Sequence, residues 1–251
     1  MTANLRVIIE DKATSGAWNM AVDEALLETA LESNVPTLRW YQWNEPTLSL
    51  GHFQSEDDST IDTRFASLAK VRRLSGGGAI LHDREWTYSI SIGPSHPLAA
   101  HPGRLYSLVH ETIVGVLREF RVPAQLRGQA NDALDHHFLC FSRGDANDVV
   151  VGHHKILGSA QRRRRGAILQ HGALLLQASE YAPEFPGIHE FCTSPLDERR
   201  LFDTVTRTVA DAVDATWKSG TLTDAEHQRA EVLMADEYSQ LHRPSKGPSS
   251  T

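Results

Sequence analysis

The residues most able to do chemistry are Cys140 and Lys155, which lie fifteen positions apart. Only the thiolate form of cysteine attacks well, and the pKa of a free thiol is about 8.5. A nearby ammonium group lowers that pKa, so Lys155 would activate Cys140 if folding brings the two together. The segment Gly158-Ser159-Ala160 follows the lysine, and its backbone N–H groups could stabilise an oxyanion. The opposite interpretation is that Cys140 is one of the many buried, inert free cysteines.

A second candidate site is the glycine run in RRLSGGGAILHD, residues 72–83. Three consecutive glycines are costly to order, and such runs persist where the backbone passes close to a ligand. Their amides could bind an anion, with added charge from Arg72 and Arg73. A flexible hairpin turn is the alternative. The run is neither a Walker loop nor a dinucleotide-binding fingerprint, because no Gly-Lys-Ser/Thr follows it and the next element is a strand.

The remaining polar residues do not predict a metal site. Two histidine pairs, at residues 136–137 and 153–154, point to opposite faces if they lie in strands. No set of His, Cys and Asp residues shows zinc spacing, so we predict no metal. Cys192 lies in a Pro-containing segment, and we interpret it as structural or incidental.

Composition bounds the class of protein. The chain has 251 residues, 40% hydrophobic and 23% charged, which is typical of a globular protein. A net charge of -7 argues against general nucleic-acid binding, although the run Arg162–Arg165 is either a solvated turn or a contact for an acidic partner. Two cysteines and an N-terminus without a long apolar run predict a cytoplasmic protein that does not span a membrane.

The hydrophobic periodicity predicts a mixture of helices and strands that must position these residues. Helices are expected at residues 15–32 and 104–120, from residue 201, and from Thr223, where Glu226 completes a capping box. Strands are expected at residues 5–9, twice within 36–51 around an Asn44-Glu45-Pro46 turn, on both sides of the glycine run, and at 86–92, 148–152, 155–159 and 167–176. In residues 86–92 the alternation predicts a half-buried antiparallel strand.

These elements favour an α+β fold, with mixed or antiparallel sheets flanked by helices. We predict one catalytic domain over residues 1–242, with C-terminal helices at 200–242 packed on it. Residues 243–251 are rich in Pro, Ser and Gly, and we predict a disordered tail. No pattern indicates an oligomer, so a monomer is expected.

Five stretches of the chain resemble the biotin/lipoate ligase and transferase superfamily. They are NMAVDEALL (19–27), PTLRWYQWNEPTLSLGHFQ (36–54), RRLSGGGAILHDREWTYSI (72–90), KILGSAQRR (155–163) and ILQHGALLL (168–176). The resemblance covers most of residues 15–190 and implies an α+β catalytic domain whose sheet folds around an acyl or biotinyl chain.

The resemblance also implies which residues bind the acyl group. They are Arg72, Arg73, Ser75, Gly76, Gly77, Gly78, Ala79, His82, Gly158, Ser159, Ala160, His171 and Gly172. His82 and His171 are open to two interpretations, since each could shape the pocket or be a satisfied half-buried histidine.

Members of this superfamily activate the acyl group in different ways. A cysteine upstream of Lys-x-x-Gly-Ser-Ala resembles the octanoyltransferase branch, which implies a Cys140 thioester and no tightly bound cofactor. The octanoyl or lipoyl group would come from acyl carrier protein or another carrier. It would go to a lysine of a lipoyl domain or of a glycine-cleavage H-type protein.

Two other functions stay open at this point. An ATP-dependent lipoate–protein ligase would use ATP and Mg to form an acyl-adenylate. Against it, only about 75 residues follow the last matching stretch, which is short for the accessory domain that full-length ligases often carry. Biotin ligation is disfavoured because a Gly-Arg-Gly-Arg type of loop is missing. A non-catalytic acyl-binding protein is the third possibility.

Overall fold

A computed structural model describes residues 3–54, 61–129, 139, 144–192 and 195–239. Its centre is one mixed sheet of eight strands in the order β11-β1-β2-β6-β10-β9-β8-β7. The strands are β1 (Ala3–Ile9), β2 (Thr37–Tyr41), β6 (Glu85–Ile92), β7 (Ala124–Leu126), β8 (Val149–Val151), β9 (His154–Arg164), β10 (Ala167–Leu175) and β11 (Ala215–Ser219). β1 pairs in parallel with β2 and β11, and the other pairs are antiparallel.

A smaller sheet of three strands carries the glycine run. Its central strand, β3 (Thr47–Leu50), pairs in parallel with β4 (Ala69–Arg72) and antiparallel with β5 (Ile80–His82). The glycine run joins β4 to β5, which are not neighbours, so the hairpin interpretation of this run is wrong. The loop instead passes from one edge of the small sheet to the other, over the end of β3.

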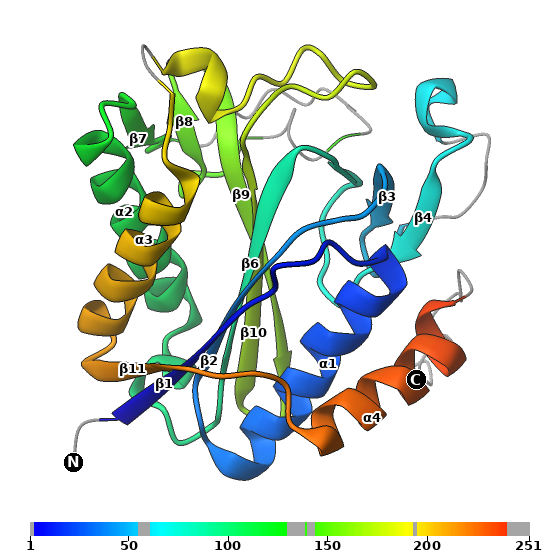
Figure 1. The fold of residues 1–251 in the computed structure, drawn as a ribbon, viewed down its shortest axis with the longest axis vertical. Coiled ribbons are helices and arrows are strands. Elements are labelled where there is room, and N and C mark those ends of the chain that lie inside the picture. The colour runs from blue at the N-terminus through cyan, green and yellow to red at the C-terminus, as the bar shows by residue number, and fades with distance from the viewer. Residues whose placement is uncertain (1–2, 55–60, 130–138, 140–143, 193–194, 240–251) are drawn as a thin grey trace, which may run out of the picture.

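Helices cover both faces of the main sheet (Figure 1). α2 (Pro102–Glu119) and α3 (Glu198–Ala212) lie together on one face, over the largest hydrophobic core. α1 (Gly16–Ser33) and α4 (Asp224–Leu233) pack together on the opposite side, and a π-helical turn, Met234–Tyr238, continues α4. The fold is therefore the α+β arrangement that the sequence predicts.

Local sequence explains where α1 begins and ends. The Ser15 side chain accepts a hydrogen bond from the Trp18 amide, which caps the first turn. Asn34 ends the helix in the left-handed conformation, with a φ of 55°. The capping box predicted at Thr223 and Glu226 is confirmed, since both reciprocal hydrogen bonds start α4.

Two expectations about strands need correction. β6 is buried on both faces, because α1 covers the side that carries Ser89 and Ser91. β9 is longer than predicted and runs on through the arginine run to Arg164. The two strands around the Asn44-Glu45-Pro46 turn exist, but they belong to different sheets, and the short strands β7 and β11 gave no clear signal in the sequence.

The predicted domain limits stay a prediction, and residues 243–251 lie outside the described residues. Across the described residues, every helix is too short or too polar to span a lipid bilayer.

Candidate active site

A small pocket with a cavity volume of about 20 Å³ lies where the small sheet meets β9 and β10 of the main sheet. The lining residues come from α1 and from strands of both sheets. They are Met20, Tyr41, Ser49, Arg73, Ile80, His82, Thr87, Gly158, Ala160, His171, Gly172 and Ala173.

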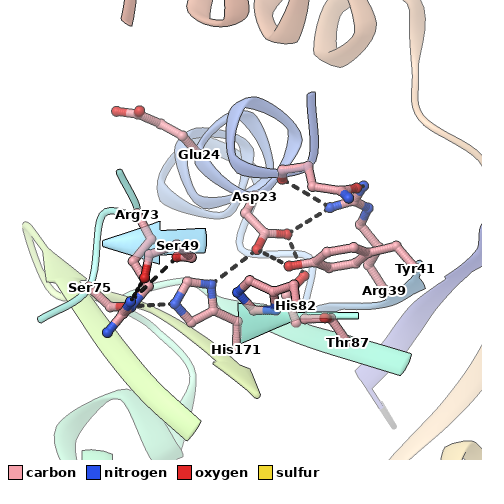
Figure 2. Close-up of polar contacts among 12 residues, drawn as sticks. Asp23, Glu24, Arg39, Tyr41, Ser49, Arg73, Ser75, His82, Thr87 and His171 are labelled. Carbon is pink, nitrogen blue, oxygen red and sulfur yellow. Dashed lines mark hydrogen bonds and ion pairs between the residues drawn. The ribbon is translucent and has the colours of Figure 1, made fainter. Parts of the chain in front are cut away.

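One wall of this pocket continues into a polar row that crosses the main sheet. In the strand register, Arg39 of β2 lies beside Ser89 of β6, and Ser89 lies beside His171 of β10. α1 crosses this row and places Asn19 and Asp23, one turn apart, directly over it. Figure 2 shows the resulting cluster, in which Asp23 lies between His171, Arg39 and Tyr41.

Asp23 is the centre of this buried network. Its carboxylate accepts hydrogen bonds from Arg39 at 2.9 Å, Tyr41 at 2.9 Å and Ser89 at 2.7 Å. Burial alone would raise the pKa of Asp23, but the hydrogen bond from His171 and the charge of Arg39 outweigh it and leave the pKa below its usual value. Asp23 is therefore a fixed anion within the protein interior.

His171 connects this network to the glycine loop. Its Nδ1 lies 3.2 Å from an Asp23 oxygen, and its Nε2 lies 2.5 Å from the Ser75 hydroxyl. Since the ionised Asp23 can only accept, Nδ1 donates to it, and Nε2 shares a second hydrogen bond with the Ser75 hydroxyl. Both ring nitrogens are thus engaged, which fixes the ring against the pocket wall.

His82 enters the pocket from β5 with a different set of partners. Its Nδ1 lies 2.7 Å from Oε1 of Glu85, and its ring stacks on Trp43 with 3.8 Å between centroids and 9° between planes. The same Glu85 oxygen accepts a hydrogen bond from the Thr87 hydroxyl at 2.6 Å. His82 and Glu85 are both buried, so the pair is held rigidly beside the cavity.

The two arginines before the glycine run hold its backbone. The Arg73 guanidinium donates to the carbonyls of Ser49, Gly76 and Gly78 at 2.7–2.9 Å. The Arg72 guanidinium binds the carbonyls of Gly51 and Gln54, each at 2.9 Å.

Two of the loop glycines are explained by geometry. Gly77 has a φ of 99°, and a Cβ atom on Gly51 would overlap the Gly77 carbonyl oxygen. The loop is therefore a packed structure and not a flexible turn.

Lys155 reaches the pocket side of β9 because of a β-bulge. Leu157 pairs with Val149 and Lys155 pairs with Val150, so Lys155 and Leu157 face opposite sides although they are two residues apart. The Lys155 ammonium lies 2.9 Å from an Asp148 oxygen, and both side chains are buried. A Cβ atom on Gly158 would overlap Cε of Lys155 and lie 2.6 Å from Nζ, so the lysine end lies directly over this glycine.

Ser159 faces away from the pocket, toward α2. Its hydroxyl bonds to Tyr88 at 2.7 Å and to Nε2 of His110 at 2.6 Å, and Nδ1 of His110 donates to the Asn147 carbonyl. Burial lowers the pKa of His110 to about 4, so the ring is neutral at pH 7. The Ser159 amide donates to the Tyr106 hydroxyl at 3.2 Å, so it is already engaged and is a poor oxyanion donor.

The structure brings together most of the residues that the sequence nominates. Arg73, His82, Lys155, Gly158, Ala160, His171 and Gly172 meet at or beside the pocket, Ser75 contacts His171, and Gly76 and Gly78 bind Arg73. Arg72 and Ser159 support backbone near the pocket, and Ala79 pairs with Leu139. Cys140 lies outside the described residues.

Sequence reasoning missed the residues that orient this set, namely Asp23, Arg39, Tyr41, Glu85 and Asp148. A usable signal was present, because Asn19 and Asp23 are polar residues one turn apart next to the apolar stripe of the predicted helix. Arg164, from the basic run, pairs with Glu24 and Glu28 of α1, so part of that run is satisfied within the chain. In the described part of the chain, no three His, Cys, Asp or Glu side chains form a group suited to a metal ion.

Comparison with known proteins gives a consistent result. Residues 15–186 match the family model of the lipoyl protein ligase A/B catalytic domain. The chain is 34% identical to octanoyltransferase LipM of Kyrpidia tusciae, over 88% of this chain and 92% of that protein. It is 32% identical to octanoyltransferase LipM of Clostridioides difficile, over 90% and 93% respectively.

The fold is similar to that of a solved lipoylation enzyme. A bipartite lipoate protein ligase from Thermoplasma acidophilum superposes with a TM-score of 0.71 at 20% identity, over 96% of this chain and 95% of that one. At this identity the likeness shows the fold alone.

Proposed function

The chain belongs to the lipoyl protein ligase A/B catalytic-domain family, and from that premise we propose that it is an octanoyltransferase of protein lipoylation. It moves an octanoyl or lipoyl group from acyl carrier protein, or from another carrier, to a lysine of a lipoyl domain or of a glycine-cleavage H-type protein. The relatives named octanoyltransferase match over nearly their whole length, which favours this function over that of the structurally similar ligases.

One structural observation carries the proposal for this chain. The β-bulge in β9 turns the buried side chain of Lys155 to the same side of the strand as Gly158, which lines the pocket. The Lys155 ammonium lies 2.9 Å from Asp148, and a cation close to a thiol favours its thiolate form. Leu139, the residue before Cys140 in the sequence, pairs with Ala79 at the end of the glycine loop.

The proposed reaction has two covalent steps. The Cys140 thiolate attacks the donor thioester, a new C–S bond forms, and the carrier thiol leaves. The acceptor lysine amine then attacks the acyl-enzyme, an amide bond forms, and Cys140 is released. The first step exchanges one thioester for another and is close to isoenergetic, and amide formation runs downhill. ATP, Mg and a bound cofactor are therefore not needed on this route.

The proposed function can be tested by identifying which acyl donor the protein uses. We expect an octanoyl adduct when the protein is incubated with octanoyl-acyl carrier protein, formed without ATP and removed by hydroxylamine. Intact mass spectrometry measures the adduct, and a lipoyl-domain acceptor measures the transfer. A product that forms only with octanoate and ATP would establish the ligase instead. Absence of transfer under both conditions would establish an acyl-binding protein.

Replacing Gly158 with alanine is expected to slow acylation roughly 100-fold with little effect on folding. The new methyl group would displace the Lys155 ammonium, and errors of about 1 Å in an active site can cost this much. The displaced atoms are the far end of a flexible side chain, so the backbone has no need to shift. Adduct formation by mass spectrometry and thermal unfolding measure the two effects.

The matched control is Gly115→Ala, in α2, where a Cβ atom would meet open space. Its acylation rate should equal that of the parent protein, and Lys155→Met should reproduce the Gly158→Ala defect. Normal acylation by both Gly158→Ala and Lys155→Met would remove Lys155 from the mechanism. The cytoplasmic location and the monomeric state stay predictions.

A further inference from the structure

The second covalent step needs a base. When the acceptor amine attacks the acyl-enzyme, its nitrogen becomes positively charged and must lose a proton for the amide to form. A positioned side chain that takes this proton contributes about 10² to 10⁴ in rate. Two nitrogen bases, His82 and His171, line the pocket, and Lys155 lies beside it over Gly158.

Lys155 and His171 are unsuitable in this structure. The Lys155 ammonium is ion-paired with Asp148 at 2.9 Å, and an ammonium group has no lone pair with which to accept a proton. His171 has its Nδ1 directed at Asp23 and its Nε2 capped by Ser75 at 2.5 Å. Both residues position their neighbours, but neither presents a vacant acceptor.

His82 differs in one of its two nitrogens. Nδ1 donates to Glu85, so the neutral ring carries its proton there and leaves the lone pair on Nε2. Among the residues that the structure describes, Nε2 of His82 has no hydrogen-bond partner. The Trp43 ring fixes the plane of the imidazole, and the side chain lines the pocket.

Glu85 gives this ring the support that a general base requires. Its Oε1 accepts from both His82 and Thr87, which holds the carboxylate in place. The carboxylate also stabilises the imidazolium that forms when Nε2 gains a proton, as in other histidine–carboxylate pairs. No other polar side chain within the described chain bonds to the second oxygen of Glu85, so its charge is directed mainly at His82.

We propose that His82, oriented by Glu85, is the general base of the aminolysis step. This inference rests on the proposed transferase function. The acceptor nitrogen forms a bond to the acyl carbon and passes a proton to Nε2 of His82. The C–S bond then breaks, and the electron pair leaves with the Cys140 sulfur as a thiolate. His82 returns its proton to water and regains the neutral form.

The test separates the two half-reactions with His82→Gln. Octanoyl-acyl carrier protein should acylate this variant at the parental rate, because the first step needs no amine deprotonation. Transfer from the isolated acyl-enzyme to a lipoyl domain should fall about 100-fold. Hydroxylamine is already unprotonated at neutral pH and is a strong nucleophile, so it should deacylate both proteins at similar rates.

Two further variants keep the result interpretable. Glu85→Gln retains the shape of the side chain but loses its charge, and it should slow aminolysis about 10-fold while acylation stays normal. His189→Gln removes another histidine paired with a glutamate, Glu198 at 3.1 Å, but on the exposed surface, and it should be silent. If His82→Gln fails to fold, the acylation and aminolysis rates of Glu85→Gln test the proposal in its place.

The possible outcomes are distinct. Normal aminolysis by the His82→Gln and Glu85→Gln acyl-enzymes would overturn this inference and leave the transferase intact. Equal losses in acylation, aminolysis and hydroxylamine cleavage would assign His82 a structural role and also overturn it. Failure of the parent protein to form any thioester would instead overturn the transferase function.

Discussion

Replacing Cys140 with alanine is expected to abolish acyl transfer and the acyl-enzyme adduct together. The proposed route passes through one sulfur, and removing the nucleophile of a covalent mechanism costs roughly 10³-fold or more in rate. Intact mass spectrometry and a transfer assay with a lipoyl-domain acceptor measure the two losses.

Cys192, the other cysteine of the chain, provides the control for this experiment. Cys192 is partly buried against the largest core, and burial raises the pKa of its thiol, so little thiolate forms at neutral pH. Cys192→Ala should therefore retain the adduct and full transfer. A Cys140→Ala protein that still transfers octanoate, or a Cys192→Ala protein that does not, would refute the assignment of the nucleophile.

The largest expected effect on stability comes from Arg39→Met. Its guanidinium is fully buried and binds Glu10, Asn19 and Asp23, while packing 3.9 Å from the centre of the Tyr41 ring. Removing one partner of a buried ion pair leaves an uncompensated charge, which typically costs about 3–5 kcal/mol. For a chain of this size we expect the melting temperature to fall by roughly 10 °C.

The comparison for this experiment is Arg64→Met, which removes an exposed arginine that also pairs with two carboxylates. Exposed pairs contribute at most about 1 kcal/mol, so the unfolding midpoint should stay close to that of the parent protein. Adding Asp23→Asn to Arg39→Met should recover part of the lost stability, because the stranded charge is removed. Equal denaturant midpoints for the two single variants would contradict a structural role for the Asp23 network.

Local features of the fold could be predicted from the sequence because they depend on neighbours along the chain. The start of α1 at Ser15 follows from a side-chain cap, and the start of α4 follows from Thr223 and Glu226. The stripe of apolar residues on α2 indicates its buried face in the same way. The glycine loop and the Lys155 segment were found through motifs whose residues are close together in sequence.

The orienting network could not be predicted in the same way. Asp23, Arg39, Ser89 and His171 come from four elements separated by up to 148 positions, and each alone resembles an ordinary polar residue. Alternation in residues 86–92 predicts a half-buried strand because a serine that faces a buried carboxylate, as Ser89 faces Asp23, fits the same pattern as a serine that faces water. Polarity in a strand shows that a partner exists but does not show whether that partner is solvent.

The β-bulge in β9 has a consequence for how this enzyme can tolerate length changes. Side chains normally alternate between the two faces of a strand, but Ile156 has no partner on β8. Lys155 and Leu157, on either side of it, therefore point to opposite faces of the sheet. Deleting or inserting one residue between Lys155 and Leu157 would turn the Lys155 side chain to the other face of the sheet. Its ammonium would then point into the core under α2. Substitutions at these positions leave each side chain on its present face of the sheet, whereas an insertion or deletion of one residue does not.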